Sequence, residues 1–157
     1  MLYRPYMPQD FDQLYALEEL CFEPPYRFSR RYMRQLVSRV NAATWIAEED
    51  RQMAGFAIVE WNQSPDEMIA YIQTIEVAPE RRGCGVGREL LGRIESSARL
   101  AGARRIWLHV EATNAGAIRL YEAHGYHCEG RKENYYPRGR SALIYRKRLE
   151  YEVVNSC

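Results

Sequence analysis

The chain has 157 residues, of which 46% are hydrophobic and 27% are charged, and 22 Lys and Arg residues face 21 Asp and Glu residues. This length predicts one domain over residues 1–157 with a sizeable buried core. The formal net charge of +1 argues against a protein that coats nucleic acid, which needs a basic excess. No apolar run reaches the ~18 residues of a membrane span, so we expect neither a nucleic-acid nor a membrane partner.

Four cysteines are scattered along the chain without a Cys-x-x-Cys pair: Cys21, Cys84, Cys128 and Cys157. This spacing favours neither a disulfide framework nor a zinc site, so we expect no bound metal. The first ten residues lack the long apolar segment of a signal peptide. We therefore expect a cytoplasmic protein, either a monomer or a weak homodimer.

The first forty residues predict a short strand, Leu2–Tyr6, and two helices. The first helix follows Pro8, because apolar residues recur there at helical spacing: Phe11, Leu14, Leu17, Leu20 and Cys21. Pro24 and Pro25 interrupt it. The second runs from Ser29 to about Val40 with Tyr32, Met33, Leu36, Val37 and Val40 on one side. Its arginines, Arg30, Arg31, Arg34 and Arg39, are typical of a solvated face, with a binding face as the alternative.

From Thr44 the pattern changes to strands, over Thr44–Glu48, Gln52–Trp61 and Met68–Val77. A period of two predicts that Tyr71, Gln73, Ile75 and Val77 share one face. A helix over Val86–Ala101 is ended by Gly102, and a strand follows at Ile106–Val110. Asn114 caps a helix that runs to about His124, before strands at Tyr126–Asn134 and Ser141–Leu149. This order of elements predicts a mixed α/β domain.

The sharpest local signal is a glycine-rich turn, Arg82-Gly-Cys-Gly-Val-Gly-Arg88, between a strand and a helix. Glycines let backbone N–H groups approach a ligand, and a helix N-terminus attracts phosphate. Arg82 and Arg88 would add positive charge. The spacing excludes a dinucleotide fingerprint, and the absence of Gly-Lys-Ser/Thr excludes a Walker A loop. A turn without a ligand is the alternative explanation of the glycines.

Three motifs in order resemble the GNAT superfamily of acetyl-CoA-dependent N-acetyltransferases. They are the turn Arg82–Gly87, the segment Trp107–Tyr126, and Lys132-Glu-Asn-Tyr-Tyr-Pro137. Within that superfamily they are similar to the bacterial ribosomal-protein-alanine acetyltransferases and their relatives that modify protein N-termini. The resemblance is dense over about residues 71–149. It implies the GNAT fold, a twisted, mostly antiparallel sheet of about seven strands flanked by about four helices.

The resemblance also implies which residues bind acetyl-CoA. Backbone groups of the strand Ile75-Glu76-Val77 would contact the pantetheine arm, and an N–H near Val77 would be the oxyanion donor. The diphosphate would lie on the amides of Arg82, Gly83, Cys84, Gly85, Val86, Gly87 and Arg88. Asn114 would lie near the reactive end and can cap its helix as well. Tyr121 would also touch the donor.

Three residues match catalytic positions of the resemblance. Tyr121, in Leu-Tyr-Glu, would protonate the departing thiolate, with core packing as the alternative. His109, in Trp-Leu-His-Val, stands where the bacterial enzymes have a glutamate base. Together with Tyr71, in Tyr-Ile-Gln-Thr, it resembles a eukaryotic E-type N-terminal acetyltransferase, in which such a pair binds a water that accepts the amine proton. A satisfied core histidine is the alternative.

Two segments would bind the acceptor. The turn between the first two helices offers Phe22, Pro24 and Tyr26, and the segment between the last two strands offers Tyr135 and Tyr136. Aromatic packing on the surface is the alternative for both. The resemblance thus implies an acetyltransferase acting on a protein N-terminus, a ribosomal protein among the candidates. An enzyme for a small amine or a lysine side chain, and a non-catalytic acyl-CoA-binding domain, are the alternatives.

Overall fold

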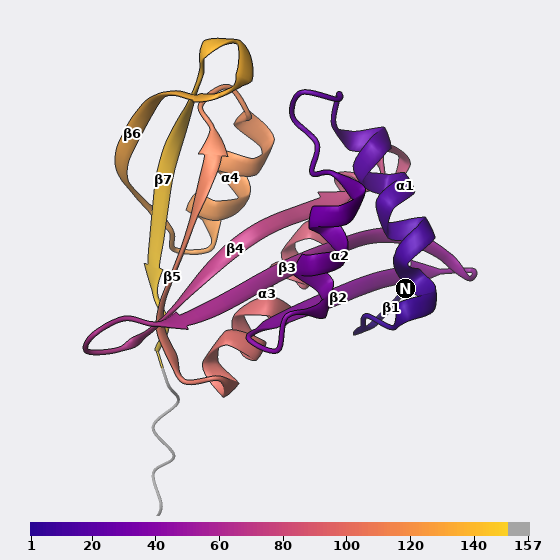
Figure 1. The fold of residues 1–157 in the computed structure, drawn as a ribbon, viewed down its shortest axis with the longest axis horizontal. Helices are drawn as coiled ribbons and strands as arrows, with labels where there is room; N and C mark the ends of the chain where they lie inside the picture. The colour runs from indigo at the N-terminus through magenta and orange to yellow at the C-terminus, as the bar shows by residue number, and fades with distance from the viewer. Residues whose placement is uncertain (151–157) are drawn as a thin grey trace, which may run out of the picture.

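The structure is a computed structural model that describes residues 1–150, so Cys157 lies outside the described residues (Figure 1). One sheet has the strand order β1-β2-β3-β4-β5-β7-β6. Its strands are β1 Leu2–Pro5, β2 Ala42–Glu49, β3 Gln52–Gln63, β4 Met68–Val77, β5 Ala103–Glu111, β6 His127–Tyr136 and β7 Arg140–Arg148. The α-helices are α1 Phe11–Cys21, α2 Arg30–Ser38, α3 Val86–Leu100 and α4 Ala115–Ala123, with 3-10 turns η1 Pro8–Asp10, η2 Pro79–Arg81 and η3 Pro137–Gly139.

All neighbouring strands are antiparallel except β4 and β5, which are parallel. The predicted mixed α/β class, with seven mostly antiparallel strands and four α-helices in the described chain, is therefore confirmed. No helix within residues 1–150 is both long enough and apolar enough to cross a bilayer.

The sheet has a core on each face. Helices α1 and α2 cover one face and α3 covers the other (Figure 1). The central strand β3 is buried on both sides: Phe56 and Ile58 pack toward α1 and α2, whereas Ala57 and Val59 pack toward α3. Burial on both faces explains why this strand is a nearly continuous apolar run.

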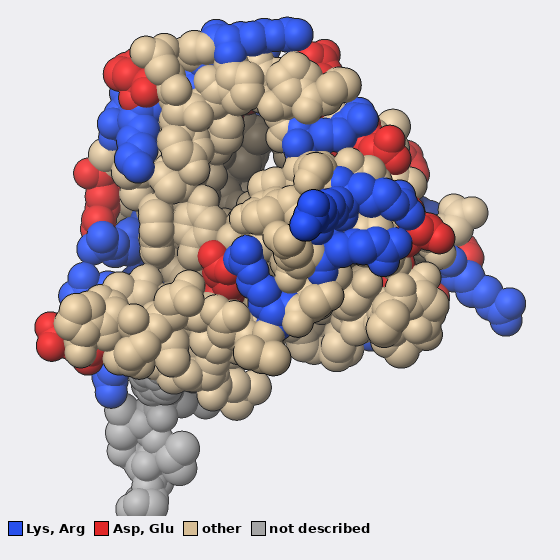
Figure 2. All heavy atoms as spheres, in the orientation of Figure 1, with Lys and Arg blue, Asp and Glu red and all other residues tan. Residues whose placement is uncertain are grey.

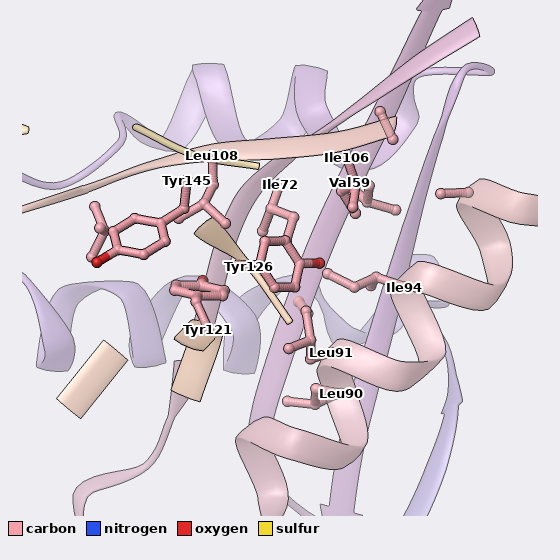
Figure 3. Packing of buried hydrophobic residues seen from close by; sticks show 14 of the residues in the cluster. Val59, Ile72, Leu90, Leu91, Ile94, Ile106, Leu108, Tyr121, Tyr126 and Tyr145 are labelled. Atoms are coloured by element: carbon pink, nitrogen blue, oxygen red, sulfur yellow. The ribbon is translucent and has the colours of Figure 1, made fainter. Parts of the chain in front are cut away.

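The core under α3 extends to the strands that bear the candidate site (Figure 3). Leu90 and Ile94 of α3 are fully buried in the cluster that also contains Leu108 of β5 and Tyr121 of α4. Each such aliphatic side chain contributes about 1.5–3 kcal/mol on burial. The strands that carry the site thus lie on a rigid support.

Local signals explain where the helices begin and end. The Ser29 hydroxyl accepts from the Tyr32 N–H at 3.0 Å, and Asn114 Oδ1 accepts from the Ala117 N–H at 3.2 Å. Gly102 follows α3 with a φ of 90°, a conformation that glycine adopts without steric cost. These predicted boundaries are confirmed within one or two residues.

Two apolar assignments are wrong. Val40 lies beyond the end of α2 and is 98% exposed, because the helix stops at Ser38. Leu20 is within α1 but 64% exposed. Leu17 and Cys21 lie on the side of the helix that faces the core, and Leu20 is not on that side.

The side chains of β4 do not alternate between the two faces of the sheet along the whole strand. The pairing of β3 with β4 changes register once, which leaves Gln73 as an extra residue. A bulge of this kind shifts the alternation by one position. Ile75 and Val77 consequently pack toward α3, whereas Tyr71 lies beside Tyr32 of α2 at a surface pocket. The prediction that Tyr71, Gln73, Ile75 and Val77 share a face is therefore wrong.

Candidate active site

The two parallel strands of the sheet separate along their length. β4 and β5 pair only as far as Tyr71 and Trp107. Beyond that point β4 continues against β3, and β5 continues against β7. A cleft of about 560 Å³ lies between the diverging halves, closed by the end of α1, the loop after it, and α4. The surface is hollowed between the part formed by β6, β7 and α4 and the part formed by α1 and α2 (Figure 2).

The glycine-rich turn leads into the N-terminus of α3. Gly83 and Gly85 have φ values of 78° and 84°, and a Cβ at either position would meet no atom within 4 Å. Gly85 is the N-cap and offers no side-chain acceptor. The Glu89 N–H donates to the Gly85 carbonyl at 3.1 Å, so the helical bonding of α3 starts there. The N–H groups ahead of Glu89 and the helix dipole suit an anion.

The two arginines of this turn differ. The Arg82 guanidinium turns back toward β4, where Nε donates to the Val77 carbonyl at 3.1 Å and a second nitrogen lies 3.6 Å from Cys21 Sγ. Its guanidinium is thus hydrogen-bonded at the end of β4, and its contribution of charge to an anion site stays a prediction. Arg88 is exposed at the start of α3, and Cys84 is exposed with its Sγ 3.7 Å from the Arg82 carbonyl.

The edge of β4 that faces the cleft lacks a strand partner after Tyr71. The Ala78 N–H donates to the Ala54 carbonyl of β3 at 2.8 Å. Because antiparallel hydrogen bonding alternates, the backbone groups of Val77 face away from β3. Its carbonyl is engaged by Arg82, which leaves its N–H directed toward the cleft side. Ile75 lines the cleft itself.

His109 and Tyr71 meet where the strands begin to diverge. The Tyr71 hydroxyl and His109 Nδ1 are hydrogen-bonded at 2.8 Å. The His109 ring stacks on Tyr135, with centroids 4.3 Å apart and planes inclined by 12°. The other ring nitrogen, Nε2, is buried and has no hydrogen-bond partner. His109 thus lines the cleft with one ring nitrogen hydrogen-bonded and the other without a partner.

Burial controls the proton affinities of this pair. It lowers the pKa of His109, with a further lowering from the nearby Lys132 charge. It raises the pKa of Tyr71, with smaller contributions from Tyr135 and Tyr136. At neutral pH the imidazole is therefore uncharged and the phenol retains its proton. A neutral imidazole is able to accept a proton.

Tyr121 lies on α4 at the other wall of the cleft. The residue is 6% exposed and edge-on to Tyr126, with ring centroids 5.4 Å apart (Figure 3). Burial, together with Tyr136, raises the pKa of its phenol, so this side chain keeps its proton at neutral pH. Tyr121 and Asn114 both line the cleft, and Asn114 caps α4 as well.

The predicted acceptor residues come from both rims. Phe22 and Tyr26 line the cleft from the loop after α1, and the Tyr26 hydroxyl donates to the Pro137 carbonyl at 3.2 Å across it. Tyr136 lines the cleft as well, and burial raises its pKa to about 12. Pro24, by contrast, is exposed and lines no part of the cleft.

Sequence reasoning missed the side chains of Glu18 and Glu76. Glu18 lines the cleft, and its carboxyl group lies close enough to that of Glu76 for each to shift the pKa of the other. A signal was present: Glu18 stands among apolar residues at helical spacing, and a charged group on a buried face needs a partner. Within residues 1–150 no group of three or more His, Cys, Asp or Glu side chains is placed to bind a metal ion.

Comparison with known proteins agrees with this geometry. Residues 11–126 match the acetyltransferase (GNAT) family. The chain is 31% identical over 129 residues to the [ribosomal protein bS18]-alanine N-acetyltransferase of Haemophilus influenzae, covering 82% of this chain and 83% of that protein. It is 42% identical over 80 residues to a streptothricin acetyltransferase of Streptomyces lavendulae, covering 49% and 40%. The crystal structure of the ribosomal-protein-S18-alanine N-acetyltransferase from Escherichia coli superposes with a TM-score of 0.82 at 25% identity, covering 98% and 97%.

The chain belongs to the acetyltransferase (GNAT) family and is an N-acetyltransferase with acetyl-CoA as its acyl donor. The chemistry of the cleft fits this donor. Unpaired N–H groups at the start of α3 suit a diphosphate, the free edge of β4 suits an amide-bearing arm, and the Tyr121 phenol lies on the facing wall.

Proposed function

We propose that the chain transfers the acetyl group of acetyl-CoA to the α-amine at the N-terminus of a protein or peptide. The observation that carries this proposal is Nε2 of His109, which is buried in the cleft without a partner. A buried polar atom without a hydrogen bond is unfavourable unless a ligand completes it. An acceptor amine, directly or through a water, is such a ligand.

The acidity of amines favours an α-amine as acceptor. An α-amine has a pKa of ~8, so about 10% is neutral at pH 7, whereas a lysine amine at ~10.4 is only about 0.04% neutral. Burial lowers the pKa of His109, which makes the imidazole a weaker base. A weak base suits the more acidic α-ammonium group better than a lysine.

Each proposed catalytic residue has one task. Bound acetyl-CoA supplies a thioester carbonyl that a neutral amine attacks. His109 donates from Nδ1 to the Tyr71 oxygen, so that Nε2 keeps a lone pair for the amine proton. Tyr121 gives its hydroxyl proton to the departing sulfur. The N–H of Val77 stabilises the negative charge that develops on the carbonyl oxygen.

The proposed donor site follows the free edge of β4 into α3. Backbone groups of Ile75 and Val77 bind the pantetheine arm, whereas those of Glu76, which alternate with them, face β3. The N–H groups of residues 82–88 bind the diphosphate, and Arg88 contributes its charge. Asn114 lies toward the reactive end. This arrangement uses backbone donors almost throughout, which fits the absence of a Cβ at three positions of the turn.

The proposed acceptor site lies between the two rims of the cleft. Phe22 and Tyr26 contact the first side chain of the acceptor, and Tyr135 and Tyr136 bind its backbone. The hydrogen bond from Tyr26 to Pro137 joins the rims, which favours an extended chain over a bulky folded surface. The name of the Haemophilus influenzae relative makes a ribosomal protein with an N-terminal alanine the first acceptor to test. We expect a single domain that acts in the cytoplasm as a monomer or weak homodimer.

A small-molecule amine is the second candidate acceptor, because the streptothricin acetyltransferase matches about half of the chain. A non-catalytic acyl-CoA-binding domain is disfavoured by the joint presence of Tyr71, His109 and Tyr121 in one region. Incubation of the chain with acetyl-CoA and short peptides, with free or blocked α-amines, separates these functions by mass shift. Acetylation that requires a free α-amine supports the proposal. Acetylation only of blocked peptides with a lysine, or of streptothricin alone, overturns it.

A further inference from the structure

Two carboxyl groups are buried together beneath the acceptor side of the cleft. Glu18 lies on α1 and Glu76 on β4, and the residues are 1% and 3% exposed. Within residues 1–150 neither forms an ion pair: Arg27, whose charge lowers the pKa of Glu18, pairs with Glu19. Buried carboxyl groups without a cation need another means of compensation.

Only one of the two oxygens of each carboxyl group accepts a hydrogen bond from another residue. Oε2 of Glu18 accepts from the Phe28 N–H at 3.1 Å, and Oε2 of Glu76 accepts from the Thr74 hydroxyl at 2.8 Å. Oε1 of each residue is buried and receives no donor from any other group. Each carboxyl group shifts the pKa of the other, so the two lie next to each other. Two ionised carboxylates only accept hydrogen bonds and repel each other, so one proton between them would satisfy the unpartnered oxygens.

Burial favours the protonated form of each carboxyl group. It raises the pKa of Glu76 well above its ordinary value, and it raises the pKa of Glu18 as well. Oε2 of Glu18 accepts from the Phe28 N–H, which ties the pair to the loop after α1.

The contact to Phe28 connects this pair to substrate binding. Phe28 ends the loop of residues 22–29, which lines the cleft with Phe22 and Tyr26. Glu76 lies near the end of β4, the strand that carries Tyr71. The pair therefore joins the acceptor loop to the strand that bears the candidate catalytic tyrosine.

We propose that Glu18 and Glu76 share one proton and act as positioning residues that fix the acceptor loop, residues 22–29, against β4. The loop's role as acceptor site rests on the function proposed above. When the shared proton is lost, two carboxylates face each other, the loop separates from β4, and the acceptor binds more weakly. The donor site, at the start of α3, is unaffected.

Other ionisable groups around the pair are engaged elsewhere. Cys21 of α1 has a pKa raised by burial and lies against the Val77 carbonyl. Arg27 of the loop donates to the Phe22 and Glu19 carbonyls, and Arg82 donates to the Val77 carbonyl. A pH response of the loop above the ordinary range of a glutamate is therefore expected from the carboxyl pair.

The shared proton is measured without substrate. Carboxyl-labelled glutamate in the full chain gives a carbon NMR titration of wild type, Glu76→Gln and Glu95→Gln. Glu95 is the matched control, because it is buried but paired with Lys147 at 3.0 Å. We expect a protonated carboxyl at pH 7 in wild type and Glu95→Gln, and none in Glu76→Gln. Full ionisation of all glutamates in wild type at pH 7 would overturn the proposal, whether or not the chain proves to acetylate peptides.

Steady-state kinetics test the positioning role. The amide of Glu76→Gln donates to Glu18 at every pH, whereas Glu76→Ala leaves Oε1 of Glu18 without a partner. For Glu76→Ala we expect the KM of the acceptor peptide to rise about tenfold, with kcat and acetyl-CoA affinity within about twofold. For wild type, that KM should rise relative to Glu76→Gln only at a pH above the ordinary range of a glutamate, because burial raises the pKa of the pair. An identical pH dependence of KM in wild type and Glu76→Gln, or a uniform loss of kcat in Glu76→Ala, contradicts the positioning role.

Discussion

The hydroxyl of Tyr71 lies 2.8 Å from Nδ1 of His109, although 38 residues separate them in the chain. The contact arises because β4 and β5 run parallel at this point, with Tyr71 beside Trp107 and His109 two residues further along β5. The strands then diverge. His109 thus lines the cleft close to the point where the two strands begin to diverge.

Replacement of His109 with Ala removes the proposed base while leaving the start of α3 unchanged. We expect turnover to fall about 10²–10³-fold, within the range of general-base contributions. The Kd for acetyl-CoA, measured by calorimetry, should stay within about twofold. His127→Ala is the matched control, since His127 is exposed on β6. Wild-type turnover in His109→Ala would remove this residue from the mechanism.

Tyr71→Phe keeps the aromatic packing against Trp107 but removes the hydroxyl that fixes the imidazole. We expect turnover to fall about tenfold. Because the two side chains act as a unit, Tyr71→Phe should have little further effect in a His109→Ala background. Initial rates of the four proteins of this double-mutant cycle check the coupling, and additive losses would show that the two residues act independently.

Tyr121→Phe removes the proposed proton donor for the departing sulfur. Turnover should fall about 10²-fold, with acetyl-CoA affinity nearly unchanged. A donor with a less basic thiol, which needs less protonation on departure, should recover part of the loss. Tyr145→Phe is the control, because Tyr145 is buried in the same core but does not line the cleft. Equal effects of the two variants would indicate a packing role alone.

The pH dependence of the reaction follows from three groups: the acceptor α-amine, His109 and Tyr121. The α-amine must lose its proton, so kcat/KM should rise as the pH increases through ~8. Burial lowers the pKa of His109, so its protonation should reduce the rate only below its ordinary value of ~6.5. Burial raises the pKa of Tyr121, so no fall is expected before ~10. A pH–rate profile with an inflection assigned to His109 above ~7 would contradict this order.

Gly85→Ala tests the donor site. Gly85 has a φ of 84°, and a side chain in that conformation costs about 1–2 kcal/mol. The turn should therefore relax away from its bound shape, and affinity for coenzyme A should fall about tenfold. Gly92→Ala in α3 is the control: a Cβ there meets nothing within 4 Å and φ is ordinary, so the helix should gain about 0.5–1 kcal/mol. Equal coenzyme A affinity in both variants would argue against a diphosphate site at this turn.

Local chemistry explains how much of the fold could be predicted. Apolar spacing, the cap at Asn114 and the stop at Gly102 depend on a few neighbouring residues, so the elements and their order follow from the sequence. The face of Ile75 was mispredicted because the bulge at Gln73 arises from the register between β3 and β4. That register is a long-range property.

The candidate site likewise has a part that local motifs predict and a part that depends on long-range contacts. The motifs around Gly85 and His109 are local, whereas the direction of the Arg82 side chain depends on the Val77 carbonyl and on Cys21, 61 residues away. The buried carboxyl of Glu18 stood out within its helix. Its partner on β4 could not be identified without the three-dimensional structure.

The choice between an α-amine and a lysine as acceptor is decided by the position of the acetyl group on a peptide that has one free α-amine and one internal lysine. The chain, acetyl-CoA and this peptide are incubated at pH 7, and tandem mass spectrometry locates the modification. If His109 is the base of an α-amine acetyltransferase, we expect acetylation at the α-amine by wild type and loss of this acetylation in His109→Ala. Acetylation of the lysine, or α-amine acetylation that persists at the wild-type rate in His109→Ala, would contradict this mechanism.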